Sequence, residues 1–214
     1  MLKHASFKHG WFYHYRFCDD KVNSFCNDKL FSLKGFLNEM LTNCPHDYFL
    51  SGPRSSSLKF DLDVNLKKED TSNLSLLTKE ALIWKNYKTP HSNVEVFMLN
   101  YDKNTLAVEV PIWITSEEFE LFNHLFPNET IPLSGHIDIL QVIDGKIWIL
   151  DFKPKAHLEK YAKTQIYFYA LMLSKRTGIS LENFMCAYFD EKTCYSFDPN
   201  NAKLMVPLTI ENSN

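Results

Sequence analysis

The chain has 214 residues, of which 45% are apolar, and a formal net charge of -3 at pH 7. A chain of this length buries a sizeable core as one domain, or as one domain with an extension. Its slightly acidic balance excludes a protein held on nucleic acid by overall charge alone, although a local basic groove stays open.

The sequence also carries no segment typical of a membrane or secreted protein. No apolar run reaches the roughly 18 residues that a membrane span requires, and residues 1–15 lack the continuous apolar stretch of a signal peptide. We therefore expect an intracellular protein without a membrane partner, located in the cytoplasm or at the nucleoid, or in the host cytoplasm if the chain is viral.

The first 73 residues predict an N-terminal α/β elaboration that packs on a core spanning 74–214. Residues 1–26 are dense in aromatic and histidine side chains. This suits either a stacking, basic surface for single-stranded nucleic acid or packing on the core or another subunit. Helical spacing of leucines predicts a helix over 28–44, and clean alternation predicts a half-buried strand over 58–66.

A charged loop over 67–73 leads into the core. Leucine, alanine and tryptophan on one stripe predict a helix over 74–87. The runs 93–100 and 105–114 are interpreted as the two strands of a hairpin. Glutamates that follow a capping threonine or serine predict a short helix from 115 to about 125.

The strongest hairpin signal lies at Asp144-Gly145. An alternating run over 135–142 precedes this pair and an apolar run over 146–152 follows it, which is the pattern of a tight β-hairpin. A long helix is predicted next, over about 156–176.

Gly178 is predicted to end that helix. Strands are predicted over 183–189 and 194–197. The order of elements predicts an α/β fold with a mixed central sheet flanked by helices.

The central hairpin carries polar side chains at positions where the formation of a β-hairpin does not require them. Strand alternation places Asp151 and Lys153 on one face, and it places His136 and Asp138 together on the facing strand. Buried unpaired charges are costly, so such a cluster needs a partner, and a divalent cation such as Mg²⁺ is suited to it. An exposed hairpin face with ordinary charges is the alternative.

Four short motifs occur in order along this part of the chain: VEVPIWI from residue 108, GHIDIL from 135, ILDFKPK from 149 and QIYFYA from 165. Together they resemble the E-x-P, G-x-x-D, D/E-x-K and Q-x-x-x-Y motifs of the PD-(D/E)XK nuclease superfamily, in its RecB-like branch. The resemblance covers about 74–197. It implies a restriction-endonuclease-like αβββαβ core with an N-terminal extension.

The resemblance also implies roles for individual residues. Asp138 and Asp151 would bind Mg²⁺ or Mn²⁺, with the backbone carbonyl of Phe152 as a further ligand. Glu109 would be a ligand directly or through water, unless it only pairs with a nearby lysine. Lys153 would lie beside the attacking water and the phosphate.

Supporting roles follow for a second set of residues. Gln165 and Tyr169 would brace the site or contact the DNA backbone, with plain helix packing as the alternative. Many members of the branch carry a histidine on the first core helix, which 74–87 lacks, and His91 is a substitute candidate. Lys155 follows Lys153 with the same parity, but the proline between them leaves its role open.

The five cysteines are scattered, so we expect no disulfide framework. Some RecB-like nucleases, including those of CRISPR adaptation, bind an iron–sulfur cluster through one early cysteine and a C-terminal trio. Here the C-terminal region has only Cys186 and Cys194, and the chain has no C-x-x-C pair. We therefore expect small buried hydrophobes rather than a cluster.

These observations predict a Mg²⁺- or Mn²⁺-dependent deoxyribonuclease, with exonuclease action favoured over endonuclease action. Its partner would be single- or double-stranded DNA. A second copy of this chain, or a helicase or recombination protein, is a further candidate partner. The context would be DNA repair, recombination, replication or the processing of mobile-element or viral DNA. The alternative is a catalytically silent nuclease-fold protein that binds nucleic acid or scaffolds a complex.

Overall fold

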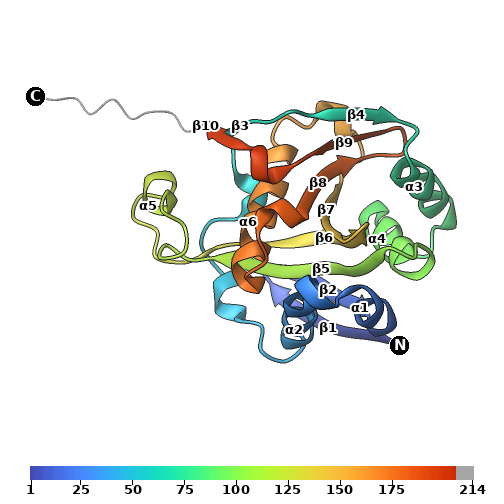
Figure 1. Cartoon of the computed structure of the whole chain (residues 1–214), viewed down its shortest axis with the longest axis horizontal. Coiled ribbons are helices and arrows are strands. Elements are labelled where there is room, and N and C mark those ends of the chain that lie inside the picture. Colours follow the sequence, from blue (N-terminus) through green and yellow to red (C-terminus); the bar gives the residue numbers. More distant parts are fainter. Residues whose placement is uncertain (206–214) are drawn as a thin grey trace, which may run out of the picture.

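The computed structural model describes residues 1–205, which form an α/β fold around one large mixed sheet. Figure 1 shows this sheet running from β1 at the lower edge to β4 at the upper edge. In that order its eight strands are β1 (Leu2–His9), β2 (Trp11–Cys18), β5 (Thr105–Ile114), β6 (Leu133–Ile143), β7 (Lys146–Phe152), β8 (Phe184–Phe189), β9 (Thr193–Phe197) and β4 (Lys67–Asp70). β7 and β8 are parallel to each other, and β6 and β7 are antiparallel. Among these residues, no helix is long and apolar enough to cross a membrane.

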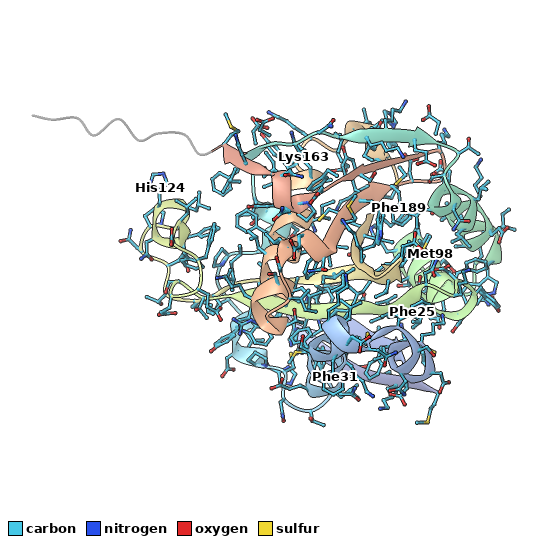
Figure 2. The ribbon with its side chains drawn as sticks, viewed as in Figure 1. Phe25, Phe31, Met98, His124, Lys163 and Phe189 are labelled. Carbon is cyan, nitrogen blue, oxygen red and sulfur yellow. The ribbon has the colours of Figure 1, made fainter. Side chains whose placement is uncertain are left out.

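Helices cover both faces of the sheet. On one face α6 (Ala162–Thr177) shares a buried cluster with side chains of α1 (Asp19–Phe25) and α2 (Phe31–Glu39). On the other face lie α3 (Asn73–Trp84) and α4 (Pro90–Tyr101), and Met98 of α4 packs in one cluster with Phe189 of β8 (Figure 2). A short helix, α5 (Phe122–Leu125), lies in the loop between β5 and β6.

The central hairpin and the elements after it agree with the sequence prediction. Asp144 and Gly145 have φ of 50° and 72° at the turn between β6 and β7, the left-handed values that a two-residue hairpin turn requires. Gly178 ends α6 with φ of 70°. The helix itself begins at Ala162, later than predicted, and a 3-10 turn occupies Ala156–Leu158.

The predicted strand over 93–100 is wrong, because this segment belongs to α4. Thr89 caps the helix by accepting a hydrogen bond from the Ser92 N–H, and Pro90 occupies its first turn. Every residue from Asn93 to Leu99 is buried. The segment therefore has no polar face, and its apolar pattern could not distinguish a helix from a strand.

The N-terminal segment joins the main sheet instead of forming a layer of its own. The prediction that its aromatic residues pack on the core is confirmed for Phe7, Tyr15 and Phe17, which are buried. Trp11 and Phe12 are 77% and 62% exposed at the hairpin turn, and the predicted nucleic-acid surface stays a prediction.

Other N-terminal elements differ from the prediction in extent. The strand expected over 58–66 is reduced to β3 (Asp61–Asp63), which pairs with β10 (Lys203–Met205) in a separate small sheet. The expected charged loop over 67–73 contains β4, which pairs with β9 at the edge of the main sheet. The helix expected over 28–44 is confined to α2, after a 3-10 turn at Asp28–Leu30.

Candidate active site

The candidate site lies where β6 and β7 separate. The two strands pair from Ile143 opposite Lys146 to Ile139 opposite Leu150, and the register ends there. Beyond this point the Phe152 N–H donates to Asp138 Oδ2 at 3.2 Å, so a carboxylate takes the place of a backbone carbonyl. β7 stays paired with β8 as far as Phe152. The separation leaves room between the strands for side chains.

Simple strand alternation breaks down at the same place. Ile137 packs in the cluster beneath α6, but Ile139 packs in the cluster beneath α4. On β5, Val110 and Val108 are divided between the same two clusters. Regular alternation along β6 would put Ile137 and Ile139 on one face of the sheet, and the structure does not follow it. Both strands change face at Asp138 and at Glu109, the residue between the two valines.

Asp138, Asp151 and Lys153 meet in this gap. The carboxyl groups of Asp138 and Asp151 are hydrogen-bonded to each other, which places them close enough to share one proton or one cation. Lys153 Nζ forms an ion pair with Asp151 Oδ2 at 2.8 Å, and this buried oxygen has no other hydrogen-bond partner in the part of the chain that the structure describes.

Glu109 lies beside this group on β5. It has φ of 51°, a left-handed conformation that costs a residue other than glycine about 1–3 kcal/mol and that concentrates at functional sites. Its carboxylate accepts a hydrogen bond from the His14 N–H. Among residues 1–205, no third Asp, Glu, His or Cys offers a ligand atom within 4.8 Å of both Asp138 and Asp151. Glu109 therefore does not complete a three-residue ligand group with Asp138 and Asp151 in the described part of the chain.

Glu95 is a fourth acidic residue at the site, and sequence reasoning missed it. It projects from α4 and is 4% exposed. The pKa of Glu95 is raised well above its ordinary value by burial and by the nearby Glu109 and Asp138 carboxylates. The sequence signal was a single charged residue within a run of buried apolar ones. Because 93–100 was assigned to a strand, Glu95 was not recognised as a residue of the site.

The site has an excess of negative charge. Burial raises the pKa of Asp138, Asp151 and Glu109, and for Asp151 the neighbouring Asp138 raises it further. Burial alone would lower the pKa of the Lys153 ammonium, but the nearby Asp151 and Asp138 carboxylates outweigh burial and raise it. A divalent cation would relieve the repulsion among these groups. Carboxylate oxygens are the hard ligands that Mg²⁺ and Mn²⁺ prefer, and Mg²⁺ commonly uses one or two of them together with waters.

His91 lies at the edge of this group, in the first turn of α4. Its ring meets the Phe152 ring edge-on, with centroids 5.1 Å apart. Burial lowers the pKa of His91, while Asp151 and a hydrogen bond with the Phe152 backbone act against that shift. The structure thus brings this candidate beside Phe152, whose carbonyl was expected to be a ligand.

Gln165 and Tyr169 support Lys153 from α6. Gln165 Oε1 accepts from Lys153 Nζ at 3.1 Å, and Gln165 Nε2 donates to the Tyr169 hydroxyl at 2.8 Å. Gly135 of β6 faces Tyr169 so closely that a Cβ atom would lie 2.5 Å from the ring. This close approach is a physical reason for glycine at the start of the G-x-x-D motif.

Two further residues lie outside this arrangement. Lys155 is exposed in the turn after β7, and Pro154 separates it from the cluster. His136 is turned toward the N-terminal hairpin, where its Nε2 lies 2.9 Å from His9 Nδ1. His136 and Asp138 nevertheless line the same cavity, so His136 is a neighbour of the acidic group, as predicted.

Two cavities adjoin the acidic group and meet at Glu109. One, of about 180 Å³, is lined on its polar side by Tyr13, Arg54, Asp138 and Gln165. The other, of about 350 Å³, is lined by Arg16, Lys88 and Glu95, among others. Each cavity thus combines carboxylates with at least one cationic side chain, as a site for a phosphate and a metal ion requires.

The two C-terminal cysteines do not lie together. Cys186 packs in the cluster beneath α6, whereas Cys194 belongs to the cluster beneath α4. They face opposite sides of the sheet and cannot bind the same group.

No protein-family model matches this chain. Comparison with curated proteins likewise finds no match. The geometry of the site is accordingly the ground on which its function is argued.

Proposed function

We propose that this protein is a metal-dependent nuclease that hydrolyses DNA phosphodiester bonds. The observation that carries the proposal is the meeting of Asp138, Asp151 and Lys153 where β6 and β7 separate. In support, the elements α4, β5, β6, β7, α6 and β8, with the short α5 inserted between β5 and β6, occur in the αβββαβ order of the PD-(D/E)XK nucleases. α4 would then be the first core helix, and it carries both His91 and Glu95.

Hydrolysis of a phosphodiester demands one of the largest rate enhancements that enzymes achieve, about 10¹⁷-fold. Mg²⁺ or Mn²⁺ held by Asp138 and Asp151 would supply an activated water and neutralise phosphate charge. Lys153 places a fixed positive charge beside the reacting phosphoryl group, where charge develops in the transition state.

The neighbouring side chains prepare Lys153 for this role. The hydrogen bond to Gln165 fixes the ammonium, and the Tyr169 hydroxyl in turn fixes the amide of Gln165. A preorganised donor of this kind needs no rearrangement at the moment of reaction.

The substrate is proposed to be DNA that enters as a single strand. The cavity beside Asp138 is narrow, and Tyr13 lines it. Trp11 and Phe12, exposed at the turn just before Tyr13, offer ring faces on which bases can stack. Entry of one strand favours exonuclease action at a strand end.

Cleavage of end-labelled DNA tests the proposal. Linear and circular substrates, single- and double-stranded, are incubated with the purified protein in Mg²⁺ or Mn²⁺. We expect cleavage that EDTA abolishes and that Asp151→Asn loses, while Glu120→Gln, at an exposed position remote from the site, retains it. Inertness of the native protein on all substrates in both metals would reject the nuclease and favour a silent DNA-binding protein.

A further inference from the structure

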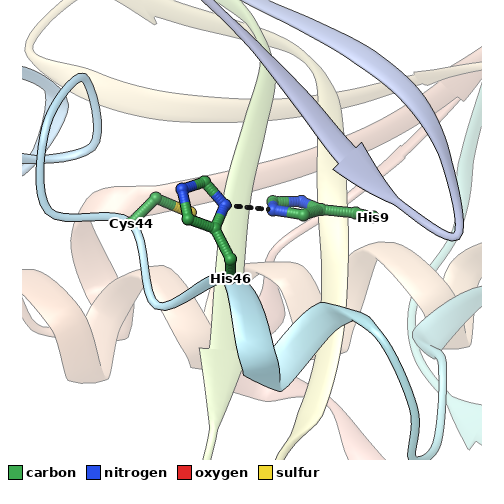
Figure 3. Close-up of side chains that lie close together, drawn as sticks. All are labelled: His9, Cys44 and His46. Atoms are coloured by element: carbon green, nitrogen blue, oxygen red, sulfur yellow. Dashed lines mark hydrogen bonds between the residues drawn. The ribbon is translucent and has the colours of Figure 1, made fainter.

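A second cluster of metal-ligating side chains lies in the N-terminal part of the molecule. His9 at the end of β1, Cys44 and His46 each offer one ligand atom, and these three atoms lie within 4.8 Å of one another (Figure 3). Among residues 1–205, no other group of three or more histidine, cysteine or acidic residues meets this criterion. The cluster shares no residue with the acidic site.

The backbone holds Cys44 and His46 in position. The His46 N–H donates to the Cys44 carbonyl at 2.9 Å, and Pro45 between them has φ of -77° and ψ of 79°. These values describe an inverse γ-turn, a tight three-residue turn that the fixed φ of proline favours. The two side chains are therefore brought together before any ligand binds.

The ring of His9 is held just as firmly. It stacks on Phe49 with centroids 4.3 Å apart and on Phe7 at 5.0 Å. His9 Nδ1 lies 2.9 Å from His136 Nε2, so this nitrogen is occupied. The other nitrogen, Nε2, is hydrogen-bonded to His46 Nδ1 at 2.9 Å, and a metal ion bound by both nitrogens would replace this bond. A second hydrogen bond of this kind fixes the tautomer and orientation of most metal-binding histidines.

We propose that His9 Nε2, His46 Nδ1 and Cys44 Sγ bind one zinc ion. Two imidazoles and a thiolate form a borderline-soft donor set that suits Zn²⁺ and is unsuited to Mg²⁺. His9 and Cys44 are buried, whereas His46 is exposed, so the ion can enter from solvent and keep water as its fourth ligand.

The protonation states are compatible with this assignment. Burial, together with His46 and Arg54, lowers the pKa of His9 to about 4, so its ring is neutral at pH 7 and a nitrogen lone pair is available. Burial raises the pKa of Cys44 to about 12, so the thiol is protonated before zinc binds. As the Zn–S bond forms, the S–H bond breaks and the proton passes to solvent.

The zinc would tie the hairpin of β1 and β2 to the segment that follows α2. That hairpin also carries Tyr13, which lines a cavity of the acidic site, and His14, whose N–H donates to Glu109. The zinc would therefore link these two segments, and its existence does not depend on nuclease activity.

Zinc binding to the full chain, purified without a histidine tag and stripped with a chelator, tests the proposal. In competition with a chromophoric chelator we expect one zinc per chain. Cys44→Ser and His46→Ala should each weaken binding by about 100-fold or more, well beyond the effect of losing a supporting residue. The matched controls are Cys26→Ser, another buried cysteine, and His124→Ala, an exposed histidine on α5 (Figure 2), and both should bind normally.

Cobalt gives a second readout that does not depend on affinity alone. Co²⁺ should produce a thiolate-to-metal absorption band in the native protein and in Cys26→Ser, and no such band in Cys44→Ser. Asp151→Asn should keep full zinc binding, which separates this site from the acidic one. Absence of tight zinc binding, unchanged binding in Cys44→Ser and His46→Ala, or loss of zinc in Asp151→Asn would each overturn the assignment.

Discussion

At the scale of single residues, the conformation of Glu109 explains how acidic groups from paired strands reach a common point. Regular β5 and β6 would keep the side chains of alternate residues on one face. The left-handed Glu109 and the change of face at Asp138 interrupt both strands at neighbouring positions. The His14 N–H stabilises the strained Glu109 by donating to its carboxylate. The interruption thus turns these carboxylates toward the gap beside β7.

Lys153→Gln is expected to lower kcat for DNA cleavage by about 10²–10³-fold, the usual cost of removing a fixed charge-stabilising donor. KM should change little, because the interaction strengthens in the transition state. Single-turnover cleavage of end-labelled DNA in Mg²⁺ measures the effect. Lys103→Gln, at an exposed lysine between α4 and β5, is the control and should retain activity. A similar loss in both variants would contradict the role of Lys153.

Glu95→Gln is expected to stabilise the metal-free protein at neutral pH. The pKa of Glu95 is raised above its ordinary 4.5 by burial, so between 4.5 and that higher value the folded state holds a proton that the unfolded chain has lost. Stability contributed by this group therefore falls as pH rises through the window. Glutamine does not titrate, so Glu95→Gln should raise the free energy of unfolding by roughly 1–3 kcal/mol at pH 8 and by little near pH 4.

Urea unfolding in EDTA at several pH values measures this difference, with the exposed Glu120→Gln as control. The comparison must be between variant and native protein at each pH. Burial lowers the pKa of His9 and His136, which makes the total stability rise with pH over part of the same range. A difference that does not grow from pH 4 to pH 8 would mean that Glu95 is not held in its protonated form by the fold.

At the scale of elements, the sequence was informative where local chemistry decides the structure. The Asp144-Gly145 turn and the glycine after α6 specify backbone conformations that few residues adopt, so their positions could be predicted. The short-range motifs likewise singled out Asp138, Asp151 and Lys153, and the structure brings these three side chains together.

The remaining features of the fold depend on tertiary packing, which short-range sequence patterns do not reveal. The segment 93–99 is buried on every side, so its periodicity carried no polar face and α4 was mistaken for a strand. Glu95 was lost with it. The change of face at Glu109 and Asp138 arises from packing against both helical layers, and alternation alone could not foresee it.

Gly135→Ala is expected to disturb the link between β6 and α6. The added Cβ would lie 2.5 Å from Tyr169 Cε1 and 3.0 Å from Ser55 Oγ, so the tyrosine must move. Overpacking of this kind costs typically 1–3 kcal/mol of stability. Because Tyr169 fixes Gln165, and Gln165 fixes Lys153, we also expect the cleavage rate to fall.

Gly35→Ala provides a matched control, because a Cβ at this position in α2 meets nothing within 4 Å. In a helix this change should stabilise the protein by about 0.5–1 kcal/mol and leave cleavage unaltered. Thermal and urea unfolding, together with the cleavage rate, distinguish the two variants. Equal stability of Gly135→Ala and the native protein would show that Tyr169 is not fixed by the close approach.

At the scale of the whole molecule, the N-terminal hairpin extends the main sheet beyond β5 and reaches the acidic site from that side. Its contact with β5 is short, with Arg16 opposite Val108 and Phe17 opposite Ala107. The same hairpin supplies Tyr13 to the cavity and exposes two aromatic rings at its turn. With a net charge of -3, the protein lacks a general attraction for DNA. Under the proposed function, local contacts at this hairpin would therefore supply much of the affinity for DNA.

Trp11→Ala and Phe12→Ala are accordingly expected to weaken binding of single-stranded DNA. Loss of one base–aromatic stack costs about 1–3 kcal/mol, which corresponds to roughly 5- to 150-fold in Kd. Fluorescence polarisation with labelled oligonucleotides measures this, in the Asp151→Asn background so that the DNA stays intact. Phe31→Ala is the control, because Phe31 is also largely exposed but lies on α2 (Figure 2). Neither the Trp11 ring nor the Phe12 ring takes part in the hydrogen bonds of the acidic site, so kcat at saturating DNA should be preserved. If Phe31→Ala weakens binding as much as the hairpin variants do, the hairpin is not the route by which the strand enters.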